Sequence, residues 1–491
     1  MKRKTMLDAA LNTPYWDVII IGGGASGLWC AYDASLRGYR TLLVEKDDFA
    51  SATSSKSTKL IHGGLRYLKQ GHLSLVREAL LERYYLRKNA PDFIKPLPFI
   101  LPYYKGIDRF LYGFGMGIYD FFASPIADEH HRSLSPNEVL EKCPTLKANA
   151  LKGGCYFYDG QFDDSRFAIE LVKMASLHEA VLLHYMPLTK FLKQGGKIVG
   201  VEVKDHFTNA VYEMFGKVII NATGIFTDEI RTLDTPHTNP IMTFSRGSHI
   251  VLDQEFLPGN TAVVFPKTKD HRIAFCIPWH GKILVGTTDV YTDKPLQEPH
   301  ATKEEITFLL EAAAQYLTKK PEVSDIKSVF AGIRPLVRNS DAPTAKLSRF
   351  HKILISNSGL ITLTGGKWTT GRKMAEDTLN YAIELGLLEN ITCKTAQMPF
   401  EEPPPSHTGK KLHPDLPYTE EDIRIAIEHE MAMTLVDLLA RRTRSLFLDV
   451  QATLEIAPTV ARILQKSLSE TDAFYEEQVK TFKTFARPYL P

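Results

Sequence analysis

The chain has 491 residues, 44% of them hydrophobic, which is enough for roughly two or three domains and excludes a single small module. Its 59 Lys and Arg residues nearly balance 57 Asp and Glu residues, so the overall charge does not point to nucleic acid as a partner. The five scattered cysteines form no CxxC pair, which indicates reduced, cytosolic packing residues rather than zinc ligands.

The N-terminal residues 1–14 include Lys2, Arg3 and Lys4 but lack the apolar core and cleavage site of a signal peptide. We therefore expect the mature chain to begin near residue 1.

Residues 17–45 read as strand, glycine-rich turn, helix and second strand, which together make a βαβ unit. Gly22, Gly24 and Gly27 form the spacing G-x-G-x-x-G, in which the glycines permit a tight turn and close approach to a pyrophosphate. Glu45 ends the second strand, where an acidic residue binds ribose hydroxyls. The sequence therefore predicts a dinucleotide site, although this motif alone does not separate FAD from NAD.

The next segments lead into a second domain. Helical periodicity over residues 73–87 ends at a proline-rich passage, residues 91–102. No stretch reaches the roughly 18 uninterrupted apolar residues of a membrane-spanning helix. The closest is the aromatic segment 110–127, which contains Asp120 and Pro125. We interpret it as a buried helix of the second domain rather than a segment that dips into a membrane.

Strand-like composition returns in the second half of the chain. The predicted strands are 218–220, 249–252, 273–277 and 283–286. Residues 401–406 are too rich in proline for helix or central strand and read as a linker, and residues 420–491 have mainly helical patterning. These patterns predict an α/β chain with an inserted β-rich domain and a helical C-terminal domain.

Residues 48–68, DFASATSSKSTKLIHGGLRYL, closely resemble a motif of the FAD-dependent glycerol-3-phosphate dehydrogenase family. Further blocks resemble the family in the same order along nearly the whole chain. They are residues 221–224 (NATG), 247–250 (GSHI), 286–289 (GTTD), 332–336 (GIRPL), 365–370 (GGKWTT) with Arg372, and 439–444 (LARRTR).

The resemblance implies a Rossmann-type FAD-binding domain made of residues 1–75, 150–232 and 328–400. It further implies a β-rich substrate-binding domain, 76–149 and 233–327, and an all-helical domain, 401–491. The implied reaction oxidises sn-glycerol 3-phosphate to dihydroxyacetone phosphate by hydride transfer to N5 of non-covalently bound FAD. The implied electron acceptor is a membrane quinone, reached from the cytoplasmic side by a peripheral protein; a homodimer is left open.

Residue roles follow from the matching blocks. The substrate phosphate calls for cations, for which the candidates are Arg66, Arg334, Arg349, Lys367 and Arg372. Arg334 is the leading candidate because its neighbours are apolar, whereas Arg349 and Arg372 suit a structural salt bridge equally well. Lys367 suits either the flavin or the substrate. The candidates for the base that takes the C2 hydroxyl proton are His62 and His249, and the sequence does not choose between them.

The remaining cofactor contacts come from the same blocks. They are Gly22, Gly24, Gly27, Glu45, Thr53, Ser54, Ser57, Leu60, Ala222, Gly224, Gly366, Lys367 and Thr369. Two residues depart from the family pattern: Gly371 stands where Tyr is usual, and Arg246 where Lys is frequent. The missing aromatic side chain at Gly371 puts local packing or substrate fit in question. Arg246 keeps the positive charge of lysine.

Two other functions stay open on the sequence. A related flavoenzyme could oxidise an amino acid or a hydroxy acid, although a carboxylate substrate would not explain the surplus of cations. A non-catalytic flavin-binding protein would bind FAD without any polyol phosphate reducing it.

Overall fold

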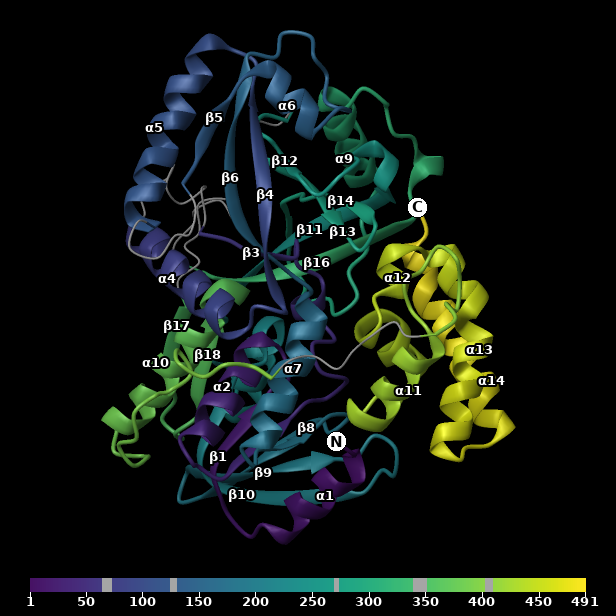
Figure 1. The fold of residues 1–491 in the computed structure, drawn as a ribbon. Helices are drawn as coiled ribbons and strands as arrows, with labels where there is room; N and C mark the ends of the chain where they lie inside the picture. Colours follow the sequence, from purple (N-terminus) through teal and green to yellow (C-terminus); the bar gives the residue numbers. More distant parts are fainter. Residues whose placement is uncertain (64–72, 124–129, 269–272, 339–350, 402–408) are drawn as a thin grey trace.

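The computed structural model describes residues 1–63, 73–123, 130–268, 273–338, 351–401 and 409–491. Figure 1 shows two sheet-containing parts, one above the other in that view, with the C-terminal helices packed alongside. The expected combination of a Rossmann-type α/β domain, a β-rich domain and a helical C-terminal domain is confirmed.

The first sheet is the parallel sheet of a dinucleotide-binding fold. Its strands follow the order β17 (His351–Ile355), β18 (Ile361–Gly365), β10 (Val211–Asn221), β1 (Trp16–Ile21), β2 (Thr41–Val44) and β7 (Val181–Leu183). All neighbouring pairs are parallel except β17 with β18. A hairpin of β8 (Leu188–Gln194) and β9 (Lys197–Lys204) extends β10.

Strand β1 carries apolar side chains on both faces, as expected for a strand with a core on each side. Val18 and Ile20 pack in the core that contains α2 (Ala25–Leu36), α7 (Asp164–Leu177) and α10 (Gly371–Glu384), whereas Ile19 and Ile21 pack in the core beneath α1 (Arg3–Asn12) and the hairpin. The alternation along one strand thus holds three layers together.

The second sheet is mainly antiparallel. Its order is β15 (Val290–Thr292), β11 (Met242–Asp253), β14 (Lys282–Gly286), β13 (Ala274–Trp279), β12 (Ala262–Phe265), β4 (Ile94–Tyr103), β6 (Gly153–Phe162) and β3 (Leu60–Ile61). Strand β16 (Ser328–Val337) pairs with β11, and β5 (Arg132–Leu134) pairs with β6. The helices of this part are α4 (Leu73–Asn89), α5 (Gly106–Ala123), α6 (Pro136–Lys142) and α9 (Lys303–Tyr316).

Several strands cross the domain boundaries expected from the sequence. The resemblance assigns residues 60–61, 153–162 and 328–337 to the FAD-binding domain, but β3, β6 and β16 pair within the second sheet. The reason is that long strand pairings, not sequence position, decide which core a segment joins. Residues 402–406 of the predicted linker lie outside the described residues.

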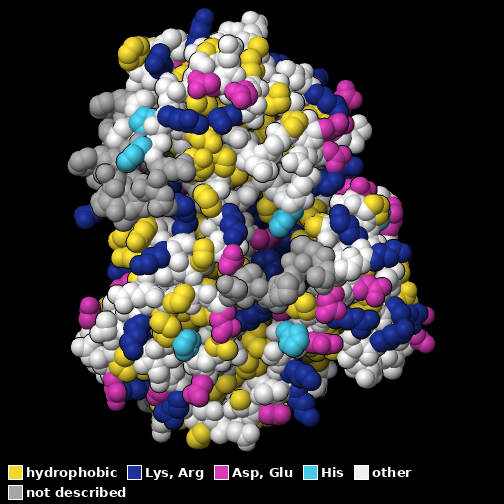
Figure 2. Space-filling view, in the orientation of Figure 1, with side chains coloured by type: hydrophobic (Ala, Val, Ile, Leu, Met, Phe, Trp, Pro, Cys, Tyr) yellow, Lys and Arg dark blue, Asp and Glu magenta, His cyan; other side chains and the backbone are white. Residues whose placement is uncertain are grey.

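Helix α5 is only partly buried, in contrast to the buried helix expected over residues 110–127. Among its described residues Met116 is buried, but Phe110 is 77% exposed, and Ile107 just before the predicted segment is 71% exposed. Within the described residues, no helix is both long enough and apolar enough to cross a bilayer. On the face seen in Figure 2, basic and acidic side chains are interspersed, without a broad patch of one sign.

The helical domain contains α11 (Glu420–His429), the π-helix η7 (Asp437–Arg442), α12 (Ser445–Leu448), α13 (Val450–Leu468), α14 (Asp472–Ala486) and the short helix η8 (Arg487–Tyr489). Its apolar core continues into the second sheet, because Phe447 packs edge-on against Phe330 of β16. The remaining short helices are η1 (Thr53–Ser55), η2 (Gly224–Phe226), α8 (Thr227–Asp234), η3 (Gln254–Phe256), η4 (Val323–Asp325) and η6 (Trp368–Thr370).

Candidate active site

The turn between β1 and α2 brings three backbone segments into close contact. Gly22 has φ +110°, and a Cβ on it would lie 2.8 Å from the Ala222 carbonyl oxygen at the end of β10. A Cβ on Gly27 would lie 1.9 Å from the Gly22 carbonyl oxygen, so only glycine lets the helix pack this tightly. The N-terminus of α2 therefore opens at the carboxyl end of the sheet, where free N–H groups suit a pyrophosphate.

Glu45 lies beside this turn, at the end of β2. Its carboxylate accepts hydrogen bonds from the backbone N–H of Gly23 (2.6 Å) and of Asp47 (2.9 Å). Burial raises the pKa of Glu45 to about 7, although these two hydrogen bonds oppose the shift. A buried strand-end carboxylate in this place suits the ribose hydroxyls of a dinucleotide.

The carboxyl ends of β10 and β18 complete the same edge, since Asn221 lies opposite Thr362 in the parallel pair. Both Gly365 and Gly366 have positive φ, and a Cβ on Gly366 would lie 2.2 Å from the Met374 sulfur. This tight turn leads to Lys367, whose Nζ is buried. The Trp368 indole then donates to the Ser54 carbonyl (3.0 Å), which joins β18 to segment 53–59.

Segment 53–59 bridges the two sheets. At one end Ser54 Oγ accepts a hydrogen bond from the Ala25 N–H at the start of α2 (2.9 Å). Thr53 Oγ1 donates to the Ile333 carbonyl of β16 (2.7 Å), and a Cβ on Gly332 would lie 2.8 Å from the Lys56 carbonyl oxygen. The segment therefore lies directly against β11 and β16.

His249 and Arg334 lie on the sheet face that meets this segment. Thr58 Oγ1 is 3.0 Å from His249 Nε2, and the imidazole stacks on Phe330 with ring centroids 4.8 Å apart. Burial, with Lys59 and Arg334 nearby, holds the pKa of His249 well below its usual value, so the ring is neutral. A neutral imidazole can accept a proton.

Arg334 is held by the turn after β14. Its guanidinium donates to Thr287 Oγ1 (2.8 Å) and to the Thr288 carbonyl (3.0 Å), and it lies 3.5 Å from the Asp289 carboxylate. A Cβ on Gly247 would lie 2.2 Å from Arg334 Nη2, so glycine there leaves room for the guanidinium. The side chain keeps 19% of its surface exposed, which suits a cation that contacts a ligand.

The other predicted site residues divide into three groups. Arg372 lies apart from His249 and Arg334: it is buried in ion pairs with Glu82 (2.6 Å) and Glu376 (2.8 Å), which favours the structural salt bridge that the sequence left open. His62 directly follows β3 and is half-buried. Arg66 and Arg349 lie outside the described residues.

The remaining predicted cofactor residues lie in segment 53–59, in β3, at the start of η2 and in η6. Ser57 donates from both its N–H and its hydroxyl to Asp164. Leu60 begins β3. Gly224, with φ +57°, begins η2, and Thr369 is buried in η6.

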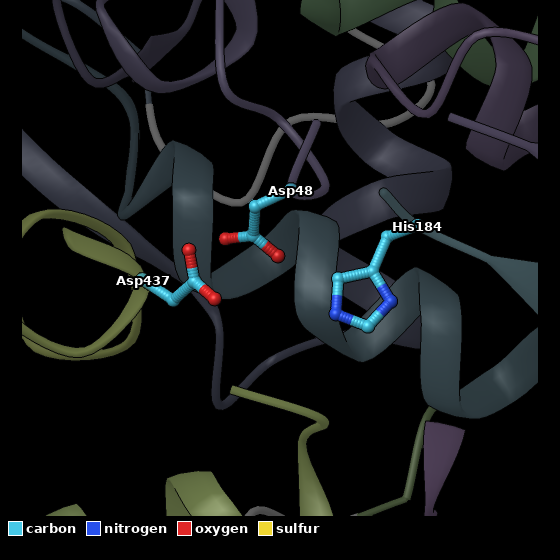
Figure 3. A group of neighbouring side chains, drawn as sticks. All are labelled: Asp48, His184 and Asp437. Carbon is cyan, nitrogen blue, oxygen red and sulfur yellow. The ribbon is translucent and has the colours of Figure 1, made fainter. Parts of the chain in front are cut away.

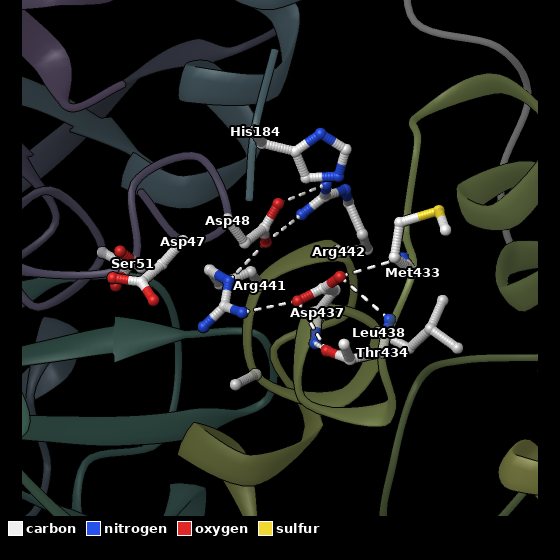
Figure 4. A network of polar contacts seen from close by, with 12 residues as sticks. Asp47, Asp48, Ser51, His184, Met433, Thr434, Asp437, Leu438, Arg441 and Arg442 are labelled. Atoms are coloured by element: carbon white, nitrogen blue, oxygen red, sulfur yellow. Dashed lines mark hydrogen bonds and ion pairs between the residues drawn. The ribbon is translucent and has the colours of Figure 1, made fainter. Parts of the chain in front are cut away.

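The arginine cluster of the helical domain binds the segment that follows β2. Figure 4 shows Arg441 and Arg442 reaching Asp48 from the π-helix, at 2.5 Å and 2.7 Å, while Arg441 also pairs with Asp437 (2.7 Å). The cluster therefore pairs with the FAD-binding part of the chain as well as within the helical domain.

Asp48, His184 and Asp437 place ligand-type atoms within 4.8 Å of one another, and Figure 3 shows the two carboxylates and the imidazole converging. Both carboxylates already accept hydrogen bonds from arginines. Since a bound cation would compete with two buried guanidiniums, the cluster is better explained as an ion-pair network than as a metal centre.

The comparisons with known proteins agree with this geometry. Residues 17–372 match a family described as FAD dependent oxidoreductase, and residues 388–473 match the C-terminal domain of alpha-glycerophosphate oxidase. A probable mitochondrial glycerol-3-phosphate dehydrogenase of Caenorhabditis elegans is 36% identical over 98% of this chain and 75% of that protein. The mitochondrial glycerol-3-phosphate dehydrogenase of Bos taurus shows the same identity and coverage.

The chain belongs to the FAD-dependent glycerol-3-phosphate dehydrogenase family. Among solved structures, the glycerol-3-phosphate dehydrogenase from Bacillus halodurans complexed with FAD matches with a TM-score of 0.79 and 28% identity, over 100% of this chain and 98% of that one. The L-alpha-glycerophosphate oxidase of Mycoplasma pneumoniae, at 19% identity and a TM-score of 0.61, covers 79% of this chain and 100% of its own and shows the shared fold.

The residues present fit the FAD of this dehydrogenase family. The closely packed Gly22 and Gly27, the N-terminus of α2 and the buried Glu45 suit the adenosine diphosphate part. The flavin end would lie where Ala222, Gly366 and segment 53–59 meet. The expected cofactor, FAD, is therefore supported by both the fold and the family.

Sequence reasoning missed three residues of this dehydrogenase-family site. Thr58, Thr287 and Asp164 contact His249, Arg334 and Ser57 respectively, but none was predicted as a site residue. Thr58 and Thr287 lie inside blocks that resemble the family. Their hydroxyl groups, close in sequence to predicted site residues, could have indicated that they belong to the site. Asp164 had no such signal, since it begins an ordinary helix.

Proposed function

We propose that this protein oxidises sn-glycerol 3-phosphate to dihydroxyacetone phosphate. One observation carries the proposal: the neutral His249 and the partly exposed Arg334 share the sheet face that meets segment 53–59, whose other end contacts the start of α2. This arrangement would place a proton acceptor and an anion-binding cation beside the flavin. When bound, FAD would supply the hydride acceptor, N5.

Arg334 suits the substrate phosphate because a guanidinium forms two parallel hydrogen bonds to a phosphoryl group. The contacts of Arg334 with Thr287 and with the Thr288 carbonyl would fix its orientation before substrate binds. Arg66 and Arg349 stay predicted partners in this role. Lys367 follows the glycine turn at the carboxyl end of β18, and it would place positive charge near the flavin or the substrate.

His249 is the favoured acceptor for the C2 hydroxyl proton, and His62 stays the alternative. The ring is neutral, buried and fixed on one side by Phe330, so it would hold one orientation toward the substrate. A bound phosphate dianion would also make protonation of the imidazole easier by offsetting the charges of Lys59 and Arg334.

Steady-state turnover with an artificial electron acceptor tests the proposed substrate. We expect turnover with glycerol 3-phosphate and none with glycine, proline or lactate at equal concentration. Turnover with an amino acid or a hydroxy acid alone would favour the other flavoenzyme function. Bound FAD without turnover on any of these compounds would favour a non-catalytic flavoprotein.

For the electron acceptor we propose a membrane quinone, reached by a peripheral protein on the cytoplasmic side. The exposed Ile107 and Phe110 support this, because they lie near the start of α5 together with the exposed cations Lys105 and Arg109. Apolar and basic side chains together provide reversible attachment to an anionic membrane.

Vesicle binding tests the membrane proposal. We expect sedimentation with vesicles that contain anionic lipid, and loss of sedimentation in an Ile107→Ser, Phe110→Ser double variant. The matched control is Leu177→Ser at the end of α7, since Leu177 is also exposed, at 55%. Equal sedimentation of all three proteins would contradict a membrane role for α5. Gel filtration of the same samples tests the homodimer.

A further inference from the structure

Arg444 is a fully buried arginine of the helical domain that reaches segment 53–59. Its Nη2 donates to the Ser55 carbonyl (2.7 Å) and to Asp164 Oδ1 (3.3 Å), while Nη1 donates to the Ala440 carbonyl (2.7 Å). The guanidinium thus joins the π-helix, the start of α7 and segment 53–59.

Asp164 binds the same segment from α7. Its Oδ2 accepts hydrogen bonds from the Ser57 N–H (2.9 Å), the Ser57 hydroxyl (2.7 Å) and Lys59 Nζ (2.7 Å). Lys59 Nζ in turn donates to the Ser55 carbonyl (2.9 Å). Ser55, Ser57 and Lys59 are therefore all fixed by one buried charge cluster.

Thr58 stands between two of these fixed residues, and its hydroxyl is the group that lies 3.0 Å from His249 Nε2. Movement of Ser57 or Lys59 would therefore change the contact between Thr58 and the imidazole. This gives a polar route from Arg444 through Asp164 and segment 53–59 to His249.

An aromatic route leads to the face of the His249 ring. The Arg444 guanidinium lies 4.1 Å from the Phe447 ring centroid, and Phe447 packs edge-on against Phe330 with centroids 4.8 Å apart. Phe330 stacks on His249 at 4.8 Å with an interplanar angle of 13°. Arg444 thus supports the imidazole through both its hydrogen-bond partner and its stacking partner.

We propose that Arg444 is a positioning residue of the dehydrogenase, which holds Thr58 and Phe330 so that His249 has one fixed orientation. The helical domain then takes part in the reaction through the geometry of the proton acceptor. The inference rests on the proposed function, because it requires His249 to accept the substrate proton.

A double-mutant cycle on the holoenzyme tests the polar route. The variants are Thr58→Val, Arg444→Lys and their combination, and the rate measured is that of flavin reduction by glycerol 3-phosphate under anaerobic conditions. Lysine keeps the charge but loses the forked geometry that spans Ser55 and Asp164. We expect each single variant to slow reduction roughly tenfold with FAD content unchanged, and the double variant to be no slower than the slower single one.

Two control variants complete the design. Thr58→Ser keeps the hydroxyl and is expected to retain most of the wild-type rate. Arg462→Ala, which removes a side chain of the same domain exposed to 46%, is expected to match wild type. If Arg444→Lys does not accumulate as holoenzyme, Phe447→Leu interrupts the aromatic route instead and is expected to slow reduction similarly.

Several results would overturn the inference. One is an unchanged rate of flavin reduction in Thr58→Val, or in Arg444→Lys or its substitute Phe447→Leu. Another is an equal rate in Thr58→Ser and Thr58→Val. A third is a double variant in which the fold-reductions in rate of the two single variants multiply. Failure of the proposed function looks different, because glycerol 3-phosphate would then leave the flavin of the wild-type protein oxidised.

Discussion

The Asp48 carboxylate and the Arg442 guanidinium form a two-point ion pair, with distances of 2.7 Å and 2.8 Å, although 394 residues separate them along the chain. Burial alone would raise the pKa of Asp48, but Arg442 and Arg441 together lower it well below its usual range. This pair joins the C-terminal helical domain to the segment that follows β2 of the FAD-binding part.

Replacing Asp48 by Asn should destabilise the protein strongly. Two guanidiniums would then stay buried without their shared carboxylate, and breaking a buried ion pair costs about 3 kcal/mol or more. The free energy of unfolding, measured in urea, checks this. Asp472→Asn removes the carboxylate of an exposed pair with Arg462 and should show no measurable change. Equal stability of the two variants would contradict a structural role for Asp48.

Replacing Arg334 by Ala should weaken the use of glycerol 3-phosphate. A charge-assisted, two-point contact with phosphate is worth about 2–4 kcal/mol, so kcat/KM should fall by roughly 30-fold to 1000-fold. Arg334→Lys should recover part of the loss. Arg424→Ala, which breaks an exposed pair with Glu420, serves as the control. Unchanged kcat/KM in Arg334→Ala would exclude Arg334 as the phosphate ligand.

The affinity for FAD should depend on the ionisation of Glu45. Because ribose hydroxyls donate to a carboxylate, binding favours the ionised form, whereas the ligand-free protein holds the pKa of Glu45 at about 7. The Kd of the apoprotein for FAD should therefore rise as pH falls below about 7, by up to tenfold per pH unit. Flavin fluorescence measures this Kd. Glu45→Gln should bind FAD more weakly and without that pH dependence; a wild-type Kd that does not vary with pH would contradict the assignment.

Acid should destabilise the protein through His184. Burial lowers the pKa of His184 to about 4 from its usual 6.5, so the native state lacks a proton that the unfolded chain binds between these values. The stability that His184 contributes above pH 6.5 should thus be lost as pH falls toward 4, by about 1.4 kcal/mol per pH unit, while the raised pKa of Glu45 acts in the opposite direction. Urea unfolding across this range checks the slope. His184→Asn should have a smaller slope, and an identical slope would rule out His184 as its source.

Gly371 has a structural explanation in Trp29. A Cβ on Gly371 would lie 2.6 Å from the Trp29 ring, so the indole takes the space that a larger side chain would need. Gly371→Tyr should therefore lower the free energy of unfolding by about 1–3 kcal/mol through overpacking. The double variant with Trp29→Ala should lose less free energy of unfolding than the two single variants together. Thermal unfolding of the holoenzyme variants measures this, and additive losses would show that the two positions do not compete for space.

Local patterns allowed the βαβ unit and its glycine turn to be predicted, and the structure confirms both. The glycine spacing, the strand before it and Glu45 follow each other within about 30 residues, as the βαβ unit requires. Contacts between distant segments could not be predicted in this way. The partner of Arg372 is Glu82, 290 residues away, and the partner of Arg444 is Ser55, 389 residues away. No periodicity in a single sequence encodes such pairs.

The exposure of Phe110 was missed for a related reason. An aromatic, glycine-rich helix has the composition of a buried helix or of a membrane-binding one, and only the surrounding strands decide which. Here α5 lies at the outer side of the second sheet (Figure 1) and leaves Ile107 and Phe110 uncovered.

Anaerobic mixing of the purified holoenzyme with one equivalent of glycerol 3-phosphate tests the central claim most directly. We expect the visible absorption of the oxidised flavin to be lost and dihydroxyacetone phosphate to appear in equal amount. A flavin that dithionite reduces, but that stays oxidised with excess glycerol 3-phosphate, would contradict it.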